Sequence, residues 1–352
     1  MLRPIKLLLT ATGAPGCSTL IRQLKNNGER KIEIISTDID EEVIGKFWSD
    51  KFYIVPPADS EDYIGSIKKI IKKENPDVFL PVSSAEVIPV SKNKQILEKN
   101  GTKVMVSSYE SLEIATNKYK LYLKLEENDI SVPKFYYPKN LEEFIDMAKR
   151  LGYPTKKVCF KPHIGKGSRG FRILDESISR KDLLLNYKPE SKYISLKEFI
   201  DIFKKEEDFP DFIIMEYIEG KAYDAMALCY EGETLLTTVK TREKERWGIV
   251  TYGELVENNE ITKLVEDIIS TVPLSYNVGL QFIGNKLIEI NPRLSTFIYQ
   301  DNLIEPYLAI KLCLGEITKN EIRKYQKKIE YGRRMIRYMD QIFWNKKNKK
   351  IY

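Results

Sequence analysis

Hydrophobic and polar positions follow two different periods in the first third of the chain. Short runs of β-branched and aliphatic residues predict strands, and between them apolar residues recur three and four positions apart, as in amphipathic helices. The predicted strands are 5–10, 31–37, 52–55, 78–82 and 103–106. The predicted helices are 19–27, 61–74 and 86–100. This strand–helix alternation predicts a parallel, doubly wound sheet.

The pattern changes after residue 115 to a mixture of helices and strand pairs. An amphipathic helix is predicted at 141–151 and a second at 260–272, with strands at 158–161, 171–174 and 212–217. Two strand pairs follow, 222–230 with 233–240 and 278–283 with 286–290.

The turn after the first strand is a candidate nucleotide site. It reads Thr12-Gly-Ala-Pro-Gly-Cys-Ser18 and opens a helix, which is where doubly wound folds bind ligands. It lacks the GxGxxG spacing, although Asp38 ends the second strand where an acid would contact a ribose. An oxidoreductase that uses a dinucleotide remains one alternative, and tight-turn geometry alone explains Gly13 and Gly16.

Composition narrows the chemistry. The 352 residues include one histidine, His163, which excludes a mechanism or metal site that needs two imidazoles from one chain. Four widely spaced cysteines suggest neither a disulfide framework nor a zinc site, and predict a reducing, cytoplasmic location. No apolar run reaches the length of about 18 residues that a membrane span needs. Dimerisation is the default expectation for assembly, and a homodimer is our prediction.

The net charge of +6 is concentrated at the end of the chain. Residues 316–352 hold 12 Lys and Arg against 4 Asp and Glu, a net of +8, which leaves −2 for residues 1–315. A solvated terminus explains this excess, and contact with an acidic partner is the alternative. No nucleic-acid-binding motif accompanies the charge, so a nucleic-acid partner is not favoured.

A glycine-rich loop lies between two predicted strands in the segment Phe160-Lys-Pro-His-Ile-Gly-Lys-Gly-Ser-Arg-Gly170. Glycines let backbone N–H groups approach phosphate oxygens, and lysine and arginine neutralise them. The loop is not a Walker A loop, because GxxxxGK[ST] is absent. A mobile hairpin turn is the alternative explanation.

The late strand pair carries polar side chains on one face. In Gln281-Phe-Ile-Gly-Asn-Lys-Leu-Ile-Glu-Ile-Asn-Pro-Arg293, Glu289 and Asn291 are two residues apart and share a strand face. Together with Gln281 they offer oxygen ligands of the kind that Mg²⁺ prefers. Arg293 lies two residues further on, where it is suited to hold a transferring phosphoryl group. A hydrophobic strand with a chance polar face is the alternative.

In this order, the glycine-rich loop, the strand Ile213-Ile-Met-Glu-Tyr-Ile-Glu-Gly220 and the late strand pair resemble the ATP-grasp superfamily, in particular its carbamoyl-phosphate-synthase large-chain-like branch. Ala115-Thr-Asn-Lys118 resembles the start of the family's nucleotide-binding part, and Leu80–Glu86 resembles its preceding Rossmann-like domain. The resemblance covers most of residues 5–312. It implies an N-terminal Rossmann-like parallel sheet followed by an ATP-grasp fold of two α+β subdomains.

The resemblance implies a role for each matching residue. Lys118 and Lys161 would contact the phosphates of ATP, and the backbone of Gly165, Gly167, Ser168 and Gly170 would close over them. Glu216, Tyr217 and Ile218 would form the adenine hinge, with Glu216 and Ile218 acting through their backbones. Gln281, Glu289 and Asn291 would bind Mg²⁺ or Mn²⁺, and Arg293 and Lys161 would be catalytic. The family's ribose-binding acid is replaced by Ala222, and Asp224 and Glu219 are the two candidate substitutes.

The implied activity is an ATP-dependent carboxylate–amine ligase that proceeds through an acyl phosphate, acting on small-molecule carboxylate and amine substrates. A non-catalytic ATP-binding regulatory or assembly protein is the alternative. The predicted divisions are a Rossmann-like domain over 1–115, a lid subdomain over 116–220, a magnesium and phosphate subdomain over 221–315, and a basic helical tail over 316–352.

Overall fold

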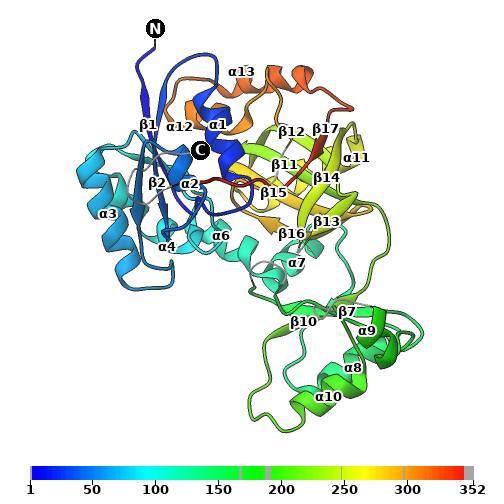
Figure 1. Cartoon of the computed structure of the whole chain (residues 1–352). Coiled ribbons are helices and arrows are strands. Elements are labelled where there is room, and N and C mark those ends of the chain that lie inside the picture. The colour runs from blue at the N-terminus through cyan, green and yellow to red at the C-terminus, as the bar shows by residue number, and fades with distance from the viewer. Residues whose placement is uncertain (1, 166–168, 187–191, 247, 296–297, 345–352) are drawn as a thin grey trace.

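The computed structural model describes residues 2–165, 169–186, 192–246, 248–295 and 298–344, and they form three sheets (Figure 1). None of the helices in these residues combines the length and apolarity that a membrane span requires.

The N-terminal sheet is parallel, as predicted. Its strand order is β3-β2-β1-β4-β5, formed by β1 (Ile5–Leu9), β2 (Ile32–Asp38), β3 (Lys51–Ile54), β4 (Val78–Leu80) and β5 (Lys103–Val104). Both faces are covered, because Leu7 and Leu9 pack in the core that contains α1 (Cys17–Lys25), while Leu8 packs in the core that contains α3 (Asp62–Glu74). Burial on both faces explains why β1 is a continuous apolar run.

The helix predicted over 86–100 is divided into α4 (Val87–Lys92), α5 (Lys94–Leu97) and the 3₁₀ helix η1 (Glu98–Asn100). The break falls at Asn93, whose backbone leaves the helical region at φ −109° and ψ 11°. Its side-chain amide donates to the carbonyl of Pro89 at 2.9 Å. An asparagine side chain that bonds to nearby backbone competes with the helix in this way. The short helix α2 (Gly45–Trp48) precedes β3.

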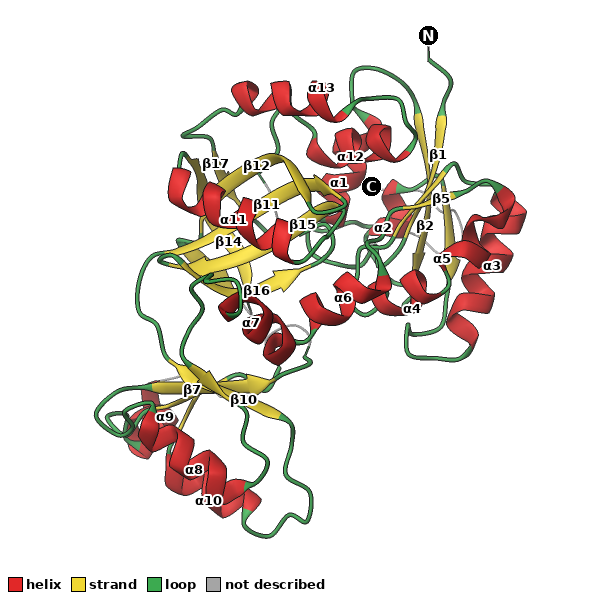
Figure 2. Ribbon diagram, turned by 180° about the vertical axis from the view of Figure 1, so that it is seen from behind, coloured by secondary structure: helices red, strands yellow, loops and turns green. Residues whose placement is uncertain are grey.

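The second sheet projects from the rest of the molecule (Figures 1 and 2). Its strand order is β6-β10-β7-β8-β9, formed by β6 (Phe135–Tyr136), β7 (Val158–Pro162), β8 (Arg172–Leu174), β9 (Tyr193–Ile194) and β10 (Phe212–Glu216). The helices α8 (Leu141–Arg150) and α10 (Leu196–Phe203) share its core, in which Phe144 stacks on Phe199 with ring centroids 4.0 Å apart. The remaining helix is α9 (Arg180–Asn186). This aromatic core makes the projecting part a packed unit.

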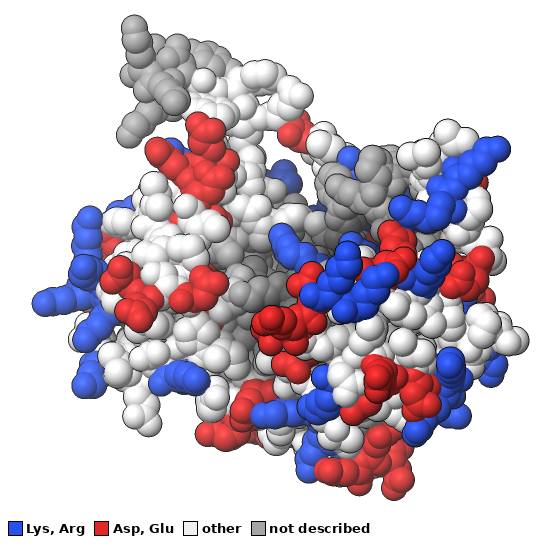
Figure 3. Space-filling view, turned by 90° about the horizontal axis from the view of Figure 1, so that it is seen from below, with Lys and Arg blue, Asp and Glu red and all other residues white. Residues whose placement is uncertain are grey.

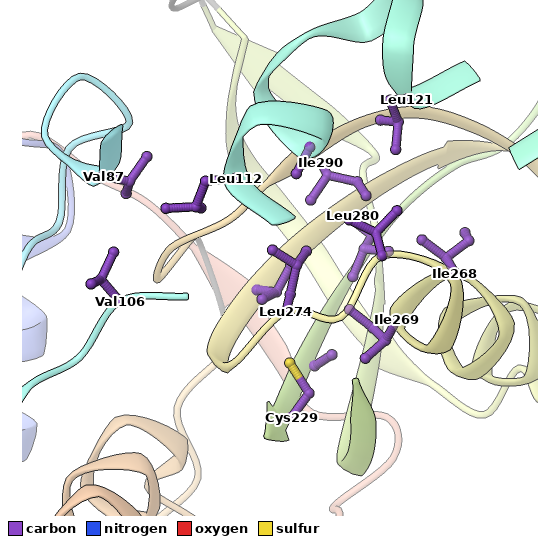
Figure 4. Packing of buried hydrophobic residues seen from close by; sticks show 14 of the residues in the cluster. Val87, Val106, Leu112, Leu121, Cys229, Ile268, Ile269, Leu274, Leu280 and Ile290 are labelled. Carbon is purple, nitrogen blue, oxygen red and sulfur yellow. The ribbon is translucent and has the colours of Figure 1, made fainter. Parts of the chain in front are cut away.

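The third sheet has the order β13-β14-β12-β11-β15-β16, with β17 paired to β14. Its strands are β11 (Ala222–Tyr230), β12 (Glu233–Thr241), β13 (Lys244–Arg246), β14 (Ile249–Val256), β15 (Tyr276–Ile283), β16 (Lys286–Asn291) and β17 (Arg334–Ile336). Leu280 and Ile290 face a core shared with α6 (Tyr109–Thr116), α7 (Lys118–Glu126) and α11 (Asn259–Thr271), as Figure 4 shows. Side chains alternate along a strand, so their neighbours Gln281 and Glu289 point to the other face.

Two features differ from the sequence-based divisions. The helix α7 was grouped with the lid, but it packs beside α11, and the Tyr122 hydroxyl on it donates to the carbonyl of Ile288 at 2.6 Å. The tail was expected to be helical, and it is so only in part. After α12 (Glu305–Cys313), α13 (Lys319–Arg323) and η2 (Lys324–Lys328) form, but β17 then joins the third sheet. Pairing with a strand edge overrides the local helical pattern.

Candidate functional site

A cleft with a volume of ≈ 2510 Å³ lies where the three sheets and the chain end meet. Its lining includes the turn before α1, the start of α7, the β7–β8 hairpin, the strands β15 and β16, and the segment that includes and follows β17. In Figure 3, positive and negative side chains are mixed over the hollowed face seen from below. The cleft is therefore the candidate site, because it brings together most of the residues that the sequence singled out.

The late hairpin presents its polar side chains to this cleft. Gln281 on β15 lies directly opposite Glu289 on β16, and Gly279 lies opposite Asn291. The side-chain amide of Asn291 donates to the Glu289 carboxylate at 3.3 Å. One carboxylate and two amide oxygens on neighbouring strand positions fit the oxygen ligand set of Mg²⁺. The residues present thus fit the metal that the sequence predicted.

Arg293 follows this hairpin and connects it to the N-terminal domain. Its Nε donates to the Ser84 hydroxyl at 3.0 Å and its Nη1 to the carbonyl of Leu294 at 2.6 Å. Its Nη2 reaches the Asn291 side-chain oxygen at 3.5 Å. Burial lowers the pKa of Arg293, while the nearby Glu289 charge opposes this effect. The guanidinium is therefore fixed beside the oxygen ligand set.

Lys118 and Lys161 are buried cations in the same cleft. Lys161 Nζ donates to the carbonyl of Ile288 at 3.1 Å. Burial lowers the pKa of Lys161 to about 8, against the opposing charge of Glu289. Burial likewise lowers the pKa of Lys118, and Glu289 again acts in the opposite direction. Two desolvated ammonium groups around one carboxylate leave excess positive charge that favours an anionic ligand.

The described residues of the glycine-rich loop border the same cleft. Gly165 lines the cleft, and the backbone N–H of Lys118 donates to the carbonyl of His163 at 2.9 Å, which ties α7 to the loop. Gly170 has φ +75°, and a Cβ there would lie 2.7 Å from Cδ of Pro162. Glycine is thus required where the loop turns back onto β7. Gly167 and Ser168 lie outside the described residues.

The predicted adenine hinge has one residue in the cleft, Tyr217. The Glu216 carboxylate accepts from the backbone N–H of Lys134 at 3.0 Å and from Lys286 Nζ at 2.5 Å. Burial raises the pKa of Glu216, whereas the contact with Lys286 and the hydrogen bond from the backbone of Lys134 lower it. The lowering effects are larger, so the pKa of Glu216 lies below its ordinary value. Its side chain therefore joins the second and third sheets, and adenine contact through the backbones of Glu216 and Ile218 remains a prediction.

Asp224, the candidate ribose ligand, belongs to a buried group of ion pairs. Its carboxylate is buried and accepts from Lys240 Nζ at 2.8 Å and from Arg242 Nη1 at 2.8 Å. Burial raises the pKa of Asp224, whereas the two cations lower it. The effect of the cations is larger, so the pKa of Asp224 lies below its ordinary value. The residue lies opposite Gln281 in the sheet, so it borders the predicted metal ligands. These ion pairs explain the burial of Asp224 without a nucleotide, but Asp224 also lines the cleft, and its contact with the ribose remains a prediction.

The turn before α1 uses Asp38 for its own structure. The Asp38 carboxylate accepts from the backbone N–H of Gly13 at 2.7 Å and of Ile39 at 2.8 Å. This arrangement favours the tight-turn explanation over a dinucleotide site. Burial raises the pKa of the Cys17 thiol to about 12, in keeping with a structural cysteine.

The sequence reasoning missed the residues that hold the site residues in place. Ser84 binds Arg293, and the Tyr122 hydroxyl shares the Ile288 carbonyl with Lys161. A tyrosine on a helix and a serine in a loop carry no sequence signal for these contacts, because the partners are 166 and 209 residues away. Arg337 also lines the cleft and was missed for the same reason, because its Nε donates to the carbonyl of Val250, 87 residues away.

Comparison with known families and proteins agrees with this geometry. The family profile "ATP-grasp domain" matches residues 115–297, and "PylC-like, N-terminal domain" matches residues 7–105. The chain therefore belongs to the ATP-grasp ligase family, as the sequence resemblance indicated. The matched range 115–297 includes the cleft residues from Lys118 to Arg293.

Curated relatives carry the name carbamoyl phosphate synthase large chain. That of Pseudothermotoga lettingae is 29% identical over 217 residues, which is 62% of this chain and 17% of the relative. That of Clostridium acetobutylicum is 22% identical over 307 residues, which is 83% of this chain and 26% of the relative. The chain thus spans at most about a quarter of the length of these two relatives.

Solved structures share the fold. The biotin carboxylase domain of 2-oxoglutarate carboxylase from Hydrogenobacter thermophilus has a TM-score of 0.65 and 18% identity, covering 95% of this chain and 74% of that one. N5-carboxyaminoimidazole synthetase from Staphylococcus aureus has a TM-score of 0.58 and 13% identity, covering 83% and 71%. These similarities confirm the predicted Rossmann-like and ATP-grasp architecture.

Proposed function

We propose that this protein is an ATP-dependent ligase that joins a small-molecule carboxylate to an amine through an acyl phosphate. The observation that carries the proposal is the common placement of Gln281, Glu289, Asn291 and Arg293 beside Lys118 and Lys161 in one cleft. An excess of buried positive charge next to an oxygen ligand set suits a metal-bound triphosphate.

The residues divide the work of holding ATP. Lys118 and Lys161 bind phosphate oxygens, and the loop that includes Gly165 and Gly170 covers them. Gln281, Glu289 and Asn291 are the residues that would hold Mg²⁺, which when bound supplies charge neutralisation for the phosphate oxygens. Arg293 holds the γ-phosphate. The relatives' names and the ADP in similar structures support this division.

The chemistry needs positioning more than a protein nucleophile. An oxygen of the substrate carboxylate attacks the γ-phosphorus, the bond from that phosphorus to the β–γ bridging oxygen breaks, and ADP leaves. The amine nitrogen then attacks the acyl carbon, the bond to phosphate oxygen breaks, and the amine loses a proton. The chain contributes oriented cations that line one cleft. One histidine in the whole chain suits such a reaction.

The test measures ADP release from Mg-ATP across paired panels of carboxylates and amines. At least one pair is expected to release ADP, and Glu289→Gln is expected to abolish the release. Glu266→Gln is the matched control, because Glu266 is an exposed carboxylate on α11 outside the cleft. It should leave the rate unchanged.

Two results would contradict the proposal in different ways. Unchanged ADP release in the Glu289→Gln variant would refute the magnesium assignment. Thermal stabilisation by Mg-ATP without ADP release from any pair would favour the alternative of a non-catalytic ATP-binding protein. Stabilisation by NADH or NADPH in place of Mg-ATP would restore the oxidoreductase hypothesis.

A further inference from the structure

The end of the chain crosses the cleft as a strap, which we define as residues 334–344. At one end, β17 pairs with β14, with Tyr252 opposite Ile336 and Gly253 opposite Met335. At the other end, Trp344 packs on Phe47 of α2, with ring centroids 4.9 Å apart. Figure 1 shows this red segment running from β17 toward α1 and α2. The strap therefore joins the third sheet to the N-terminal domain.

Arg337 is the cation that the strap places in the cleft. Its backbone N–H donates to the carbonyl of Thr251 at 2.7 Å, and its Nε donates to the carbonyl of Val250 at 3.2 Å. Its Nη1 lies 3.1 Å from the position that a Cβ on Gly16 would take. The guanidinium is thus anchored to β14 through one edge, while its two Nη groups lie against the turn before α1.

The protein supplies no counter-charge for this guanidinium among the residues that the structure describes. Neighbouring arginines are paired: Arg334 with Glu254 at 2.7 Å, Arg333 with Glu330 at 2.6 Å and Arg242 with Asp224 at 2.8 Å. Arg337 forms no such pair with a described carboxylate, although burial lowers its pKa. A partly buried charge without a partner is costly unless a ligand compensates it.

Arg337 lies in the same cleft as the proposed phosphate site. Burial raises the pKa of Tyr299 well above its usual value, and the charges of Cys17 and Arg337 both act on it. Cys17 in turn interacts electrostatically with Arg293. Both Arg337 and Arg293 line the cleft, together with Cys17 and Tyr299.

We propose that Arg337 binds a carboxylate of the substrate that the reaction leaves intact, as an amino acid or a dicarboxylate would provide. This inference rests on the proposed ligase function, because the carboxylate that is activated must lie at the γ-phosphate near Arg293. A guanidinium with one edge fixed presents its remaining N–H groups to a carboxylate in the geometry that arginine favours. The strap is then a specificity-determining element.

A carboxylate suits this position better than a phosphate group. Asp38 and Asp40 line the same part of the cleft and bring negative charge close to the turn before α1. One guanidinium balances one carboxylate, whereas a phosphate dianion would leave surplus negative charge there. Binding of a phosphate group by Arg337 is therefore treated as an alternative outcome of the test.

The test uses the full chain with Mg²⁺ and a non-hydrolysable ATP analogue. Thermal unfolding is measured with each of the twenty standard α-amino acids, with succinate and glutarate, and with inorganic phosphate and O-phosphoserine as the phosphate probes. At least one carboxylate probe is expected to stabilise the wild type. Its Kd should rise roughly tenfold or more in Arg337→Gln, as expected when one charge-assisted contact is lost.

The matched control is Arg334→Gln, because Arg334 lies on the same strap but pairs with Glu254 outside the cleft. It should bind the probe as the wild type does, and all variants should bind the ATP analogue equally. Arg337→Lys keeps the charge and should recover part of the affinity, which separates ligand binding from disturbance of the strap.

Three outcomes would overturn the inference: no carboxylate probe binds the wild type, the probe's affinity is unchanged in Arg337→Gln, or only the phosphate probes bind. Each leaves binding of the ATP analogue intact. Loss of analogue binding by the wild type, or ADP release that ignores Glu289→Gln, would instead refute the proposed function.

Discussion

Replacing Lys161 with methionine tests whether this site is built for an anion at the cost of stability. Lys161 is buried, and burial lowers its pKa to about 8, from 10.5 for an ordinary lysine. Each unit corresponds to about 1.4 kcal/mol, so holding the ammonium charged below pH 8 costs roughly 3 kcal/mol. A methionine of similar length carries no such cost.

The loss of one hydrogen bond offsets part of this gain. Lys161 Nζ donates to the carbonyl of Ile288, but that carbonyl also accepts from the Tyr122 hydroxyl and keeps a partner in the variant. The net value of the lost bond is therefore about 1 kcal/mol. At pH 7 without nucleotide, we expect Lys161→Met to be more stable than the wild type by about 2 kcal/mol.

The pH dependence has a defined sign. Between the folded pKa of about 8 and the ordinary value of 10.5, the unfolded chain binds the Lys161 proton and the folded chain has released it. The wild type therefore gains stability from this group as pH rises through that window, and the advantage of Lys161→Met shrinks.

The assay is urea unfolding of both proteins from pH 6.5 to 10, without nucleotide and with Mg-ATP. Mg-ATP should stabilise the wild type strongly and Lys161→Met little, because the variant lacks the phosphate contact. A variant that is less stable than the wild type at pH 7, or that Mg-ATP stabilises equally, would refute the reasoning.

Four further substitutions have definite expected outcomes. Asp224→Asn removes the carboxylate that buried Lys240 shares with Arg242, so urea unfolding should show a loss of about 3–5 kcal/mol; the predicted ribose contact further requires a lower ATP affinity of the folded variant, and an unchanged affinity would refute that contact. Burial raises the pKa of Glu305 to about 7, so Glu305→Gln should stabilise the protein by roughly 3 kcal/mol at pH 8.5 and little at pH 4.5, where the native carboxyl is protonated; equal effects at both pH values would contradict this. A Cβ at Gly279 would lie 2.5 Å from Cβ of Ser295, so Gly279→Ala should cost about 1–3 kcal/mol in thermal unfolding and weaken Mg-ATP binding, whereas Gly65→Ala, with open space around it in α3, should stabilise by about 0.5–1 kcal/mol.

Local patterns were enough to predict the elements on which the site depends. The turn Gly284-Asn285 between two apolar runs defines the β15–β16 hairpin, and the two-residue spacing of Glu289 and Asn291 places both side chains on one face. The structure confirms this register, with Gln281 opposite Glu289. The grouping of these polar side chains was predictable because they lie within 11 positions of one another, and their binding of Mg²⁺ remains a prediction.

Distant pairing was not predictable from such patterns. The strand β14 contains Gly253, where a Cβ would lie 2.2 Å from the carbonyl oxygen of Thr241. Close approach of the two backbones, rather than strand propensity, therefore explains the glycine at this position. The strand β17 has three residues in a basic segment, and its partner lies about 80 positions earlier. The strand β17 could therefore not be predicted from its charge-rich sequence, which follows two short helices.

The roles of the cations could not be predicted from local patterns either. These roles differ according to whether a carboxylate of the protein compensates the charge of each cation. Sequence alone presents Lys161, Lys240 and Arg337 as similar positive residues in regular or charged segments. In the described structure Lys240 has a buried carboxylate partner in Asp224, Lys161 has only the nearby charge of Glu289, and Arg337 has no described carboxylate. A cation that the protein neutralises needs no ligand, whereas one that it leaves uncompensated gains most when an anion binds. The cleft therefore holds two places at which an anionic ligand relieves a cost of folding, one beside Glu289 and one under the strap.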